Sequence, residues 1–487
     1  MSKKKKTIEE LLEEAIVTEE EQAYEVPDNW IWVRTETTND IVTGSTPAKK
    51  QSEYYGGDFP FVKPADLEQG SEVVHASEYL TDQGKAVSRI IPKESTMVCC
   101  IGSIGKVGFS TVECTTNQQI NSLVPNKKMI NPKFNYYQVL NGFYQNELWN
   151  RSSATTVSII NKGKMCLIPY VLPPLNEQKR IAEKVERLLS KIEEAKQLIE
   201  EAKETFELRR AAILDKAFRG ELTRKWREEN LEKILISSDQ INSVGPNNKS
   251  IKATSLVPEA SIPDTWKWVL SNELFSFITS GSRGWAKYYS DDGDLFLRVG
   301  NLKHESIDID LTNRQNVSPP EGTESTRTLV QEGDILVSIT ADVGRIAVVP
   351  KQFPKAYINQ HIALARPSSG YCIEYVAWFL SSRNGGRLQF DRLQRGATKA
   401  GLGLNDVKNV WLPVPSLEEQ YEIVRKIQSA FNKFEVAEKS LTNTLEVYEE
   451  LKKSILGKAF RGELGTNDPS EENAIELLKE VLQEQVK

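Results

Sequence analysis

PLNEQKRIAEKVERLLSKIEEAKQLIEEAKETFELRRAAILDKAFRGEL, residues 174–222, decides the fold because a second version of it closes the chain. The triplet NEQ ending at Gln178 returns as EEQ ending at Gln420, and KAFRGEL around Phe218 returns letter for letter around Phe460. Both landmarks recur after the same interval of 242 residues. The chain therefore contains an internal repeat with no net insertion.

Each copy is predicted to form one long helix. Apolar residues recur at alternating intervals of four and three, which is the heptad seam of a left-handed coiled coil, and no proline interrupts either copy before its KAFRGEL. Residues 176–218 would form a rod roughly 65 Å long. We expect the two helices to bury their seams against each other; the alternative is that each seam packs on its own domain. The inward residues are predicted to be Ile181, Val185, Leu188, Ile192, Ala195, Ile199, Ala202, Phe206 and Ile213, then Ile423, Ile427, Ala430, Phe434, Ala437, Leu441, Tyr448, Leu451 and Ile455.

Composition restricts the class of protein. A chain of 487 residues has room for about three or four domains. No apolar run approaches membrane-spanning length, and MSKKKKTIEELLEEA at the start is not a signal peptide because an acidic segment follows its lysines. The five cysteines lack the paired spacing of a zinc site. We expect a cytoplasmic protein without a bound metal.

Net charge is −6, which argues against a generally basic nucleic-acid coat, but the charge is unevenly distributed. Residues 27–170 hold 14 basic and 13 acidic residues, and residues 263–415 hold 17 and 16. The excess of acidic residues therefore lies on the helices and tails, and each large inter-helix segment can hold a local basic cleft.

The expected organisation is α+β, a pseudo-twofold repeat of two mixed domains and two long helices. Residues 1–26 are predicted to be an amphipathic helix, 27–173 the first domain, 174–222 the first rod and 223–262 a short helix and linker. Residues 263–415 are predicted to be the second domain, 416–464 the second rod and 465–487 a tail helix. Ser416 and Glu419 fit a capping box at the start of the second rod.

The two domains share landmarks while their loops differ. PDNW at Pro27 becomes PDTW at Pro263, FVKPADL becomes FLRVGNL, IGKVG becomes VGRIA, and NQQI at Asn117 becomes NQHI at Asn359. One scaffold has thus been used twice with its loops free to diverge. If the loops read a ligand, the chain reads two unlike parts of it, as a split DNA target would supply.

These motifs, together with LPPLNEQKRIAEKVE, GDILVSITADVGRIAVV and RGATKAGLGLNDVKNVWLPVPSLEEQ, make the chain similar over nearly its whole length to the specificity subunit of type I restriction–modification enzymes. The resemblance implies two target recognition domains, one for each half of a bipartite DNA sequence, with antiparallel rods as a spacer. It also implies two modification (methyltransferase) subunits and added restriction (motor and nuclease) subunits as partners.

Two motifs that could indicate catalysis are better explained as local structure. GSIGKVG at Gly102 lacks the Ser or Thr of a P-loop at Val107 and has the wrong upstream spacing, so a turn between strands is expected. NPKF at Asn131 resembles the NPP(Y/F) pocket of amino-methyltransferases, but Lys133 replaces the second proline and Asn-Pro is an ordinary turn dipeptide. We therefore predict a DNA reader with no catalytic residues and no cofactor of its own, with S-adenosylmethionine, ATP and Mg in the partner subunits.

DNA contacts require basic side chains for phosphates and guanine, amides for adenine, and polar or aromatic groups in loops. For any single candidate, a solvated surface position is the alternative, and the signal is that basic and tyrosyl loops recur in both halves. The candidates are Lys49, Lys50, Tyr54, Tyr55, Lys63, Arg151 and Ser152 in the first domain, and Arg283, Lys287, Tyr288, Tyr289, Arg298, Arg395 and Lys399 in the second.

KAFRGEL offers a candidate partner contact because it recurs where its surroundings differ. Phe218 and Phe460 are predicted to anchor two copies of a partner; the alternative is a helix-ending turn capped by Gly220 and Gly462. The competing function is a coiled-coil scaffold whose two domains bind proteins or glycans, which salt dependence would separate from DNA binding.

Overall fold

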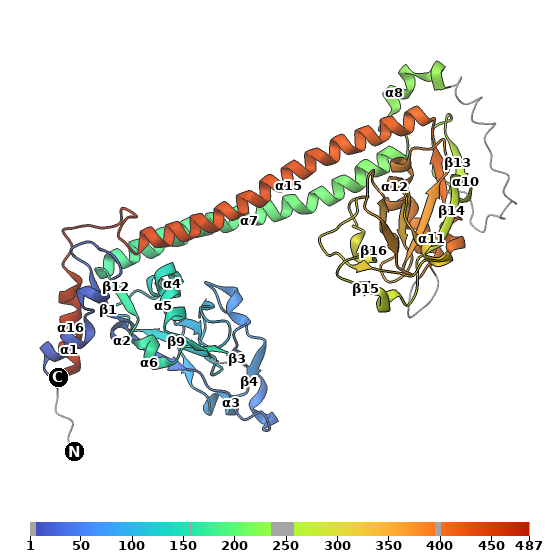
Figure 1. The fold of residues 1–487 in the computed structure, drawn as a ribbon. Helices are drawn as coiled ribbons and strands as arrows, with labels where there is room; N and C mark the ends of the chain where they lie inside the picture. The colour runs from blue at the N-terminus through green and yellow to red at the C-terminus, as the bar shows by residue number, and fades with distance from the viewer. Residues whose placement is uncertain (1–5, 155–156, 235–257, 395–400, 487) are drawn as a thin grey trace. The chain divides into compact units, whose positions relative to one another are not determined.

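Two long helices run through both of the units into which the chain divides. The computed structural model describes residues 6–154, 157–234, 258–394 and 401–486. Unit 1 comprises Met1–Leu198 and Thr442–Lys487, and unit 2 comprises Ile199–Leu441. Both divisions fall inside the long helices, α7 (Leu175–Phe218) and α15 (Leu417–Ala459). Each unit therefore holds one mixed domain and part of both helices (Figure 1).

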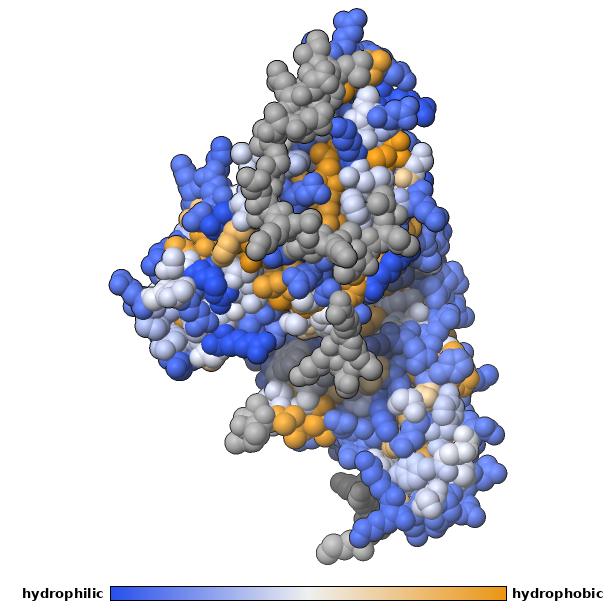
Figure 2. Space-filling model, turned by 90° about the vertical axis from the view of Figure 1, so that its right-hand side faces the viewer, coloured by the Kyte–Doolittle hydropathy of each residue, from blue (hydrophilic) through white to orange (hydrophobic). Residues whose placement is uncertain are grey.

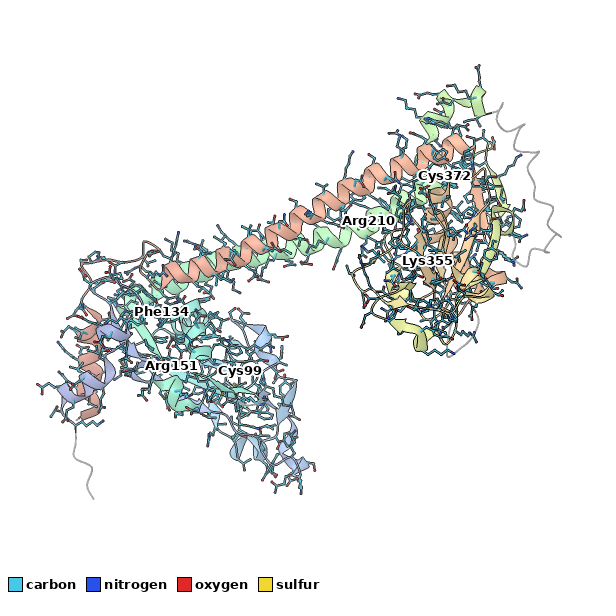
Figure 3. The ribbon with its side chains drawn as sticks, viewed as in Figure 1. Cys99, Phe134, Arg151, Arg210, Lys355 and Cys372 are labelled. Carbon is cyan, nitrogen blue, oxygen red and sulfur yellow. The ribbon has the colours of Figure 1, made fainter. Side chains whose placement is uncertain are left out.

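The helices pair antiparallel within each unit. In unit 1, Lys184 near the start of α7 donates to the carbonyl of Leu464, which follows α15, and Lys196 forms an ion pair with Glu449. In unit 2, Arg210 binds both carboxylate oxygens of Glu438, at 3.0 and 2.8 Å (Figure 3). The predicted burial of one seam against the other is confirmed: the rings of Phe206 and Phe434, for example, lie 5.5 Å apart.

The prediction that Leu451 lies in the buried seam is wrong. Leu451 is 45% exposed, whereas Tyr448 is partly buried and Ile455 is buried. The inward stripe passes from Tyr448 to Lys452, which is half-buried, and then to Ile455. The spacing here is four and then three, and the aliphatic stem of a lysine occupies a position that an apolar residue was expected to fill.

Among the described residues, domain 1 of unit 1 contains four small sheets, one of which is the two-stranded pair of Ser153–Ala154 with Ser158–Ile159. The first pairs β1 (Ile31–Arg34) with β12 (Pro169–Leu172) next to the start of α7. The second and third have the orders β2-β9-β6-β7 and β4-β3-β8-β5, and in the third β3 and β8 are parallel. These strands are β2 (Asn39–Thr43), β3 (Tyr55–Val62), β4 (Glu78–Leu80), β5 (Ile90–Ile91), β6 (Thr96–Cys99), β7 (Val107–Phe109), β8 (Cys114–Thr116) and β9 (Ile120–Pro125); the helices α4 (Pro132–Leu140) and α5 (Gly142–Asn150) follow.

Domain 2 of unit 2 repeats this plan. β13 (Lys267–Leu270) pairs with β22 (Trp411–Val414), and the two further sheets have the orders β14-β21-β18-β19 and β15-β17-β16-β20. β16 and β20 are parallel, as β3 and β8 are in domain 1. The predicted α+β fold with an internal repeat is confirmed. The strands are β14 (Phe275–Ser280), β15 (Tyr289–Ser290), β16 (Asp294–Leu297), β17 (Asn316–Val317), β18 (Ile335–Ser338), β19 (Ile346–Val348), β20 (Ala356–Ile358) and β21 (Ile362–Pro367), followed by the helices α12 (Ile373–Ser381) and α13 (Gly386–Leu393).

The two chain ends pack together in unit 1, where α1 (Ile8–Ala15) contacts α16 (Ala474–Val486). The first helix is shorter than the predicted 1–26, because Thr7 caps its start and the chain becomes extended at Ile16 to bridge with Val33. After α7, the chain forms α8 (Arg224–Glu229), and residues 235–257 of the predicted linker lie outside the described part.

A matched hydrogen bond joins each rod to its domain. Trp30 Nε1 donates to Glu177 Oε2 at 2.7 Å in unit 1, and Trp266 Nε1 donates to Glu419 Oε2 at 3.0 Å in unit 2. The predicted capping box is only half formed. The backbone N–H of Glu419 donates to Ser416 Oγ, but the Glu419 carboxylate binds Trp266, Thr223 and Arg227 instead.

Hydrophilic residues cover most of the face drawn in Figure 2, with hydrophobic residues in patches between them. Among the described residues, no helix combines the length and apolar character that a membrane crossing needs.

Candidate nucleic-acid interface

A three-residue turn links two sheets in the same way in both domains. Residues 117–119 join β8 to β9, and residues 359–361 join β20 to β21. Asn117 Oδ1 accepts from the N–H of Gln119 at 3.1 Å, and Asn359 Oδ1 accepts from the N–H of His361 at 3.1 Å. The asparagine thus folds its own turn in each half.

A glycine braces this turn in both domains. The N–H of Gly44 donates to the carbonyl of Ile120, and the N–H of Gly281 donates to that of Ile362, both at 3.0 Å. A Cβ on Gly44 would collide with the carbonyl oxygen of Asn117, and one on Gly281 with that of Asn359. Only glycine fits so close to another backbone, so the two turns share one rigid frame.

A basic residue follows the strand next to each turn. Lys63 follows β3 and Arg298 follows β16, and each of these strands runs parallel to the strand that leads into the turn. Carboxyl ends of parallel strands meet at one edge, and the N–H of Asn117 donates to Val62 just as that of Asn359 donates to Leu297. The structure therefore brings the predicted residues Lys63 and Arg298 to equivalent places.

The surroundings of these two cations differ. Lys63 forms an ion pair with Glu78 at 2.7 Å, with both side chains about one third exposed. Arg298 donates to Asn313 Oδ1 at 3.2 Å and lines an open pocket of about 400 Å³ together with Asn313, Asn359 and His361. Ala341, with φ of 69°, lines the same pocket, and its counterpart in domain 1 is Gly102, with φ of 79°.

The predicted tyrosyl loops also match in structure. Tyr54 ends a 3-10 turn and Tyr55 begins β3, while Tyr288 ends a 3-10 turn and Tyr289 begins β15. The hydroxyl of Tyr55 donates to the carbonyl of Pro47 at 2.7 Å, and burial raises the pKa of this phenol, so it remains a donor. Lys287 stacks over the Tyr288 ring at 4.9 Å. Exposed members of the two loops are Lys49, Lys50, Arg283, Lys287 and Tyr289.

Other residues predicted to contact DNA do not belong to the two turns or to the tyrosyl loops. Arg151, labelled in Figure 3, is held by Glu147 at 2.7 Å after α5, and Ser152 Oγ donates to the carbonyl of Trp149. Both precede the hairpin of β10 (Ser153–Ala154) and β11 (Ser158–Ile159). Arg395 and Lys399 lie outside the described residues.

Phe218 and Phe460, predicted as partner anchors, are used inside the chain. Phe460 is fully buried with its ring 5.3 Å from that of Phe134 in α4 (Figure 3). Phe218 is 7% exposed and lies 5.5 Å from Tyr375 and 5.1 Å from Phe379 in α12. These rings fix the ends of the rods to the domains, so direct contact of either ring with a partner conflicts with its burial.

The alternative interpretation of KAFRGEL fits the structure. Gly220 has φ of 73° and Gly462 has φ of 75°, the left-handed conformation of a helix C-terminal cap. A Cβ on Gly220 would press into Pro263 at the start of domain 2, and one on Gly462 into Pro27 at the start of domain 1. Each glycine therefore ends a rod and leaves room for the first residue of a domain.

The two motifs that could indicate catalysis lie at the start of a helix and in a turn between strands. Asn131 caps α4, its Oδ1 accepting from the N–H of Phe134 at 3.0 Å, with Pro132 in the first turn. The glycine-rich stretch at Gly102 is the turn between β6 and β7. Within the described ranges, no group of three or more His, Cys, Asp or Glu side chains is placed to hold a metal ion.

Sequence reasoning did not select the glutamines and the histidine of the two turns as site residues. NQQI and NQHI were visible as landmarks 242 residues apart, with one position changed between Gln119 and His361. The signal that could have identified them is this single change within a repeated motif.

Comparison with known proteins agrees with this duplicated arrangement. A family model described as the type I restriction modification DNA specificity domain matches residues 27–204 and 287–447. The EcoBI type I restriction enzyme specificity subunit of Escherichia coli is 27% identical over 447 residues, covering 90% of this chain and 87% of that protein. The EcoKI specificity subunit of Escherichia coli (strain K12) is 25% identical over 458 residues, covering 91% and 90%.

Solved structures share the fold. The HsdS subunit from Thermoanaerobacter tengcongensis has a TM-score of 0.53 with 21% identity, and 91% of this chain covers 100% of it. A chain from a structural study of complex assembly and conformational transition of the type I restriction–modification system has a TM-score of 0.66, also with 21% identity and the same coverage.

A duplicated DNA-reading scaffold is the class that the fold and these matches define, and the chain belongs to the type I restriction–modification DNA specificity family. The resemblance drawn from the two rods and their junctions is thereby confirmed, and the role within the system is that of the specificity subunit.

Proposed function

We propose that the chain recognises a bipartite double-stranded DNA target, each domain reading one half-site in the major groove. The observation that carries the proposal is the constant frame of turn, glycine brace and basic residue in both domains, on which the side chains differ. A constant frame with changed side chains is what two unlike half-sites require. Half-sites read from one face of DNA would lie about one helical turn, ~34 Å, apart.

The rods would act as the spacer between the two readers. Their seams are built from residues that cannot contact bases, because Phe206, Ile192 and Ile427 are buried. This division assigns the spacing of the half-sites to α7 and α15 and the choice of bases to the domains.

The partners would be two modification subunits that methylate adenine in each half-site, with restriction subunits added to cleave DNA. The repeated junctions support two copies of one partner, since the buried hydrogen bonds of Trp30 with Glu177 and of Trp266 with Glu419 hold the surrounding backbone in the same way in both halves. The chain itself would provide no catalytic group and bind no cofactor. S-adenosylmethionine would belong to the modification subunits, ATP and Mg to the restriction subunits, and the cytoplasm would be the location of the complex.

Selection of DNA by the chain in complex with its modification subunits tests this function. The complex is mixed with duplexes carrying two randomised windows separated by a fixed spacer, and bound molecules are sequenced. We expect two short preferred motifs at a fixed separation. One contiguous motif, or no preference, would overturn the proposal.

Salt dependence provides a second test. Binding should fall steeply between 50 and 200 mM salt, by about 10³-fold if some six phosphates are contacted, because counterions are released from DNA. A protein or glycan ligand would show a shallower dependence, so a flat profile would favour a scaffold function.

A further inference from the structure

We propose that the turns at residues 117–119 and 359–361 read bases directly, and that the change from Gln119 to His361 determines which hydrogen-bonding pattern each half presents. The inference rests on the proposed DNA-reading function and adds residues to it. Neither turn was among the predicted contacts, and both stand beside the cations Lys63 and Arg298.

The backbone of the two turns is held by the same contacts. Besides the asparagine and glycine bonds, Cys100 N–H donates to the carbonyl of Gln119 at 2.7 Å, and Ile339 N–H donates to that of His361 at 2.9 Å. The neighbouring serines Ser45 and Ser282 donate their N–H groups to Thr116 and Ile358. Since every one of these bonds is made by the main chain or by the constant asparagine, the side chains at positions 118, 119, 360 and 361 are not needed for the frame.

The amides of domain 1 are oriented as donors. Gln119 Oε1 accepts from Asn117 Nδ2 at 2.9 Å, and Gln118 Oε1 accepts from the hydroxyl of Thr46. Each carbonyl oxygen already accepts one hydrogen bond within the protein, and neither amide nitrogen donates to another described residue, so the amide N–H groups are left to face a ligand. Donors of this kind match guanine O6 and N7, adenine N7 or thymine O4 in the major groove.

Domain 2 differs by presenting an acceptor as well. His361 Nε2 lies 3.0 Å from Gln360 Nε2, and because an amide nitrogen only donates, the imidazole nitrogen accepts. The imidazole proton then resides on Nδ1, toward the hydroxyl of Thr340. Gln360 keeps its carbonyl oxygen as an acceptor, which matches the exocyclic amine of adenine or cytosine. His361 is therefore a positioning residue for Gln360.

Exchange of the two side chains tests the inference. Q119H and H361Q are made separately in the full chain and assayed in complex with the modification subunits on the randomised library. We expect Q119H to change the preference at one base pair of the first half-site by about tenfold, and H361Q to do so only in the second half-site. Q83H is the matched control, because Gln83 is an exposed glutamine of α3 (Asp82–Ala86) in domain 1 outside the turn.

The outcomes separate this inference from the proposed function. If the wild-type complex selects no bipartite motif, the proposed function fails. If it selects one and both exchange variants keep every preference, the inference fails and the function stands. If an exchange variant melts below the wild type, Q118A, Q119A and Q360A decide, since together they remove the reading amides; unchanged preferences in all three would refute direct reading by the turns.

Discussion

Replacing Phe460 by alanine should destabilise unit 1 even in the absence of any partner. The ring lies at the end of α15, is fully buried, and packs at 5.3 Å against Phe134 in an edge-to-face arrangement. Phe218→Ala is the equivalent change in unit 2, where the ring contacts Tyr375 and Phe379.

The magnitude follows from burial. Removing a fully buried phenylalanine ring costs about 3–5 kcal/mol through lost transfer free energy and the cavity that remains. An edge-to-face aromatic pair accounts for about 0.5–1.5 kcal/mol of such losses. We therefore expect each variant to lose about 4 kcal/mol of unfolding free energy in its own unit.

Hydrogen exchange of the free chain is the suitable assay, because a chain with two units need not unfold in one step. Phe460→Ala should speed exchange in α4 and in the part of α15 in unit 1, and Phe218→Ala should do so in α12. Leu208→Ala is the control on α7, since Leu208 is 64% exposed and its loss should change stability by less than about 0.5 kcal/mol.

If Phe218 and Phe460 were partner anchors instead, the opposite hydrogen-exchange result would be expected. Under that role, both alanine variants would leave the exchange of the free chain unchanged and would weaken only assembly with the modification subunits. That result would refute the packing argument.

Four further predictions concern the junctions, the frame and the rods. Burial raises the pKa of Glu177 above its ordinary value of 4.5, so the protonated side chain favours the folded state at low pH, and this contribution to stability is lost as the pH rises through the raised pKa. Glu177→Gln should therefore make the free energy of unfolding of unit 1 in urea less dependent on pH above about 4.5. An unchanged pH profile would contradict this. Glu419→Gln should instead lower the free energy of unfolding of unit 2 in urea by about 3–5 kcal/mol, because it leaves the mostly buried guanidinium of Arg227 without a negative partner. An unchanged free energy of unfolding would show that the ion pair is not needed. Gly44→Ala should abolish selection in the first half-site of the library and spare the second, since its Cβ collides with the turn backbone, and loss in both half-sites would contradict separate frames. The last variant deletes residues 192–198 together with residues 447–453, which lie opposite each other because Lys196 pairs with Glu449. The deletion removes about 10 Å from the rods. The preferred spacer between the half-sites should become shorter by about three base pairs, while the half-site sequences stay unchanged.

The duplicated fold could be predicted from sequence because its signals are local and periodic. Heptad spacing, the lack of proline and the constant interval between the two KAFRGEL copies depend on neighbours along the chain. The exception is Leu451, which is exposed while its neighbour Lys452 is half-buried, so packing against the partner helix decides which residue turns inward.

The candidate site could be predicted from the sequence only in part. Lys63 and Arg298 could be matched because each follows a recognisable strand, and the structure places them alike. For Phe218 and Phe460 the sequence left two roles open, since a repeated aromatic residue can equally serve an outer contact or the chain's own core. Only the three-dimensional packing of α4 and α12 against the rod ends distinguishes the two.

The sequence by itself determined that one scaffold occurs twice, with constant rods and varied loops. Tertiary structure alone decided which varied residues share a place. Lys63 and Gln119 are far apart in the chain, and both follow strands, β3 and β8, that are parallel neighbours whose carboxyl ends form one edge. Parallel pairing is a non-local contact that leaves no periodic pattern in the residues it joins. The arrangement of residues around these turns could therefore be identified only in the tertiary structure.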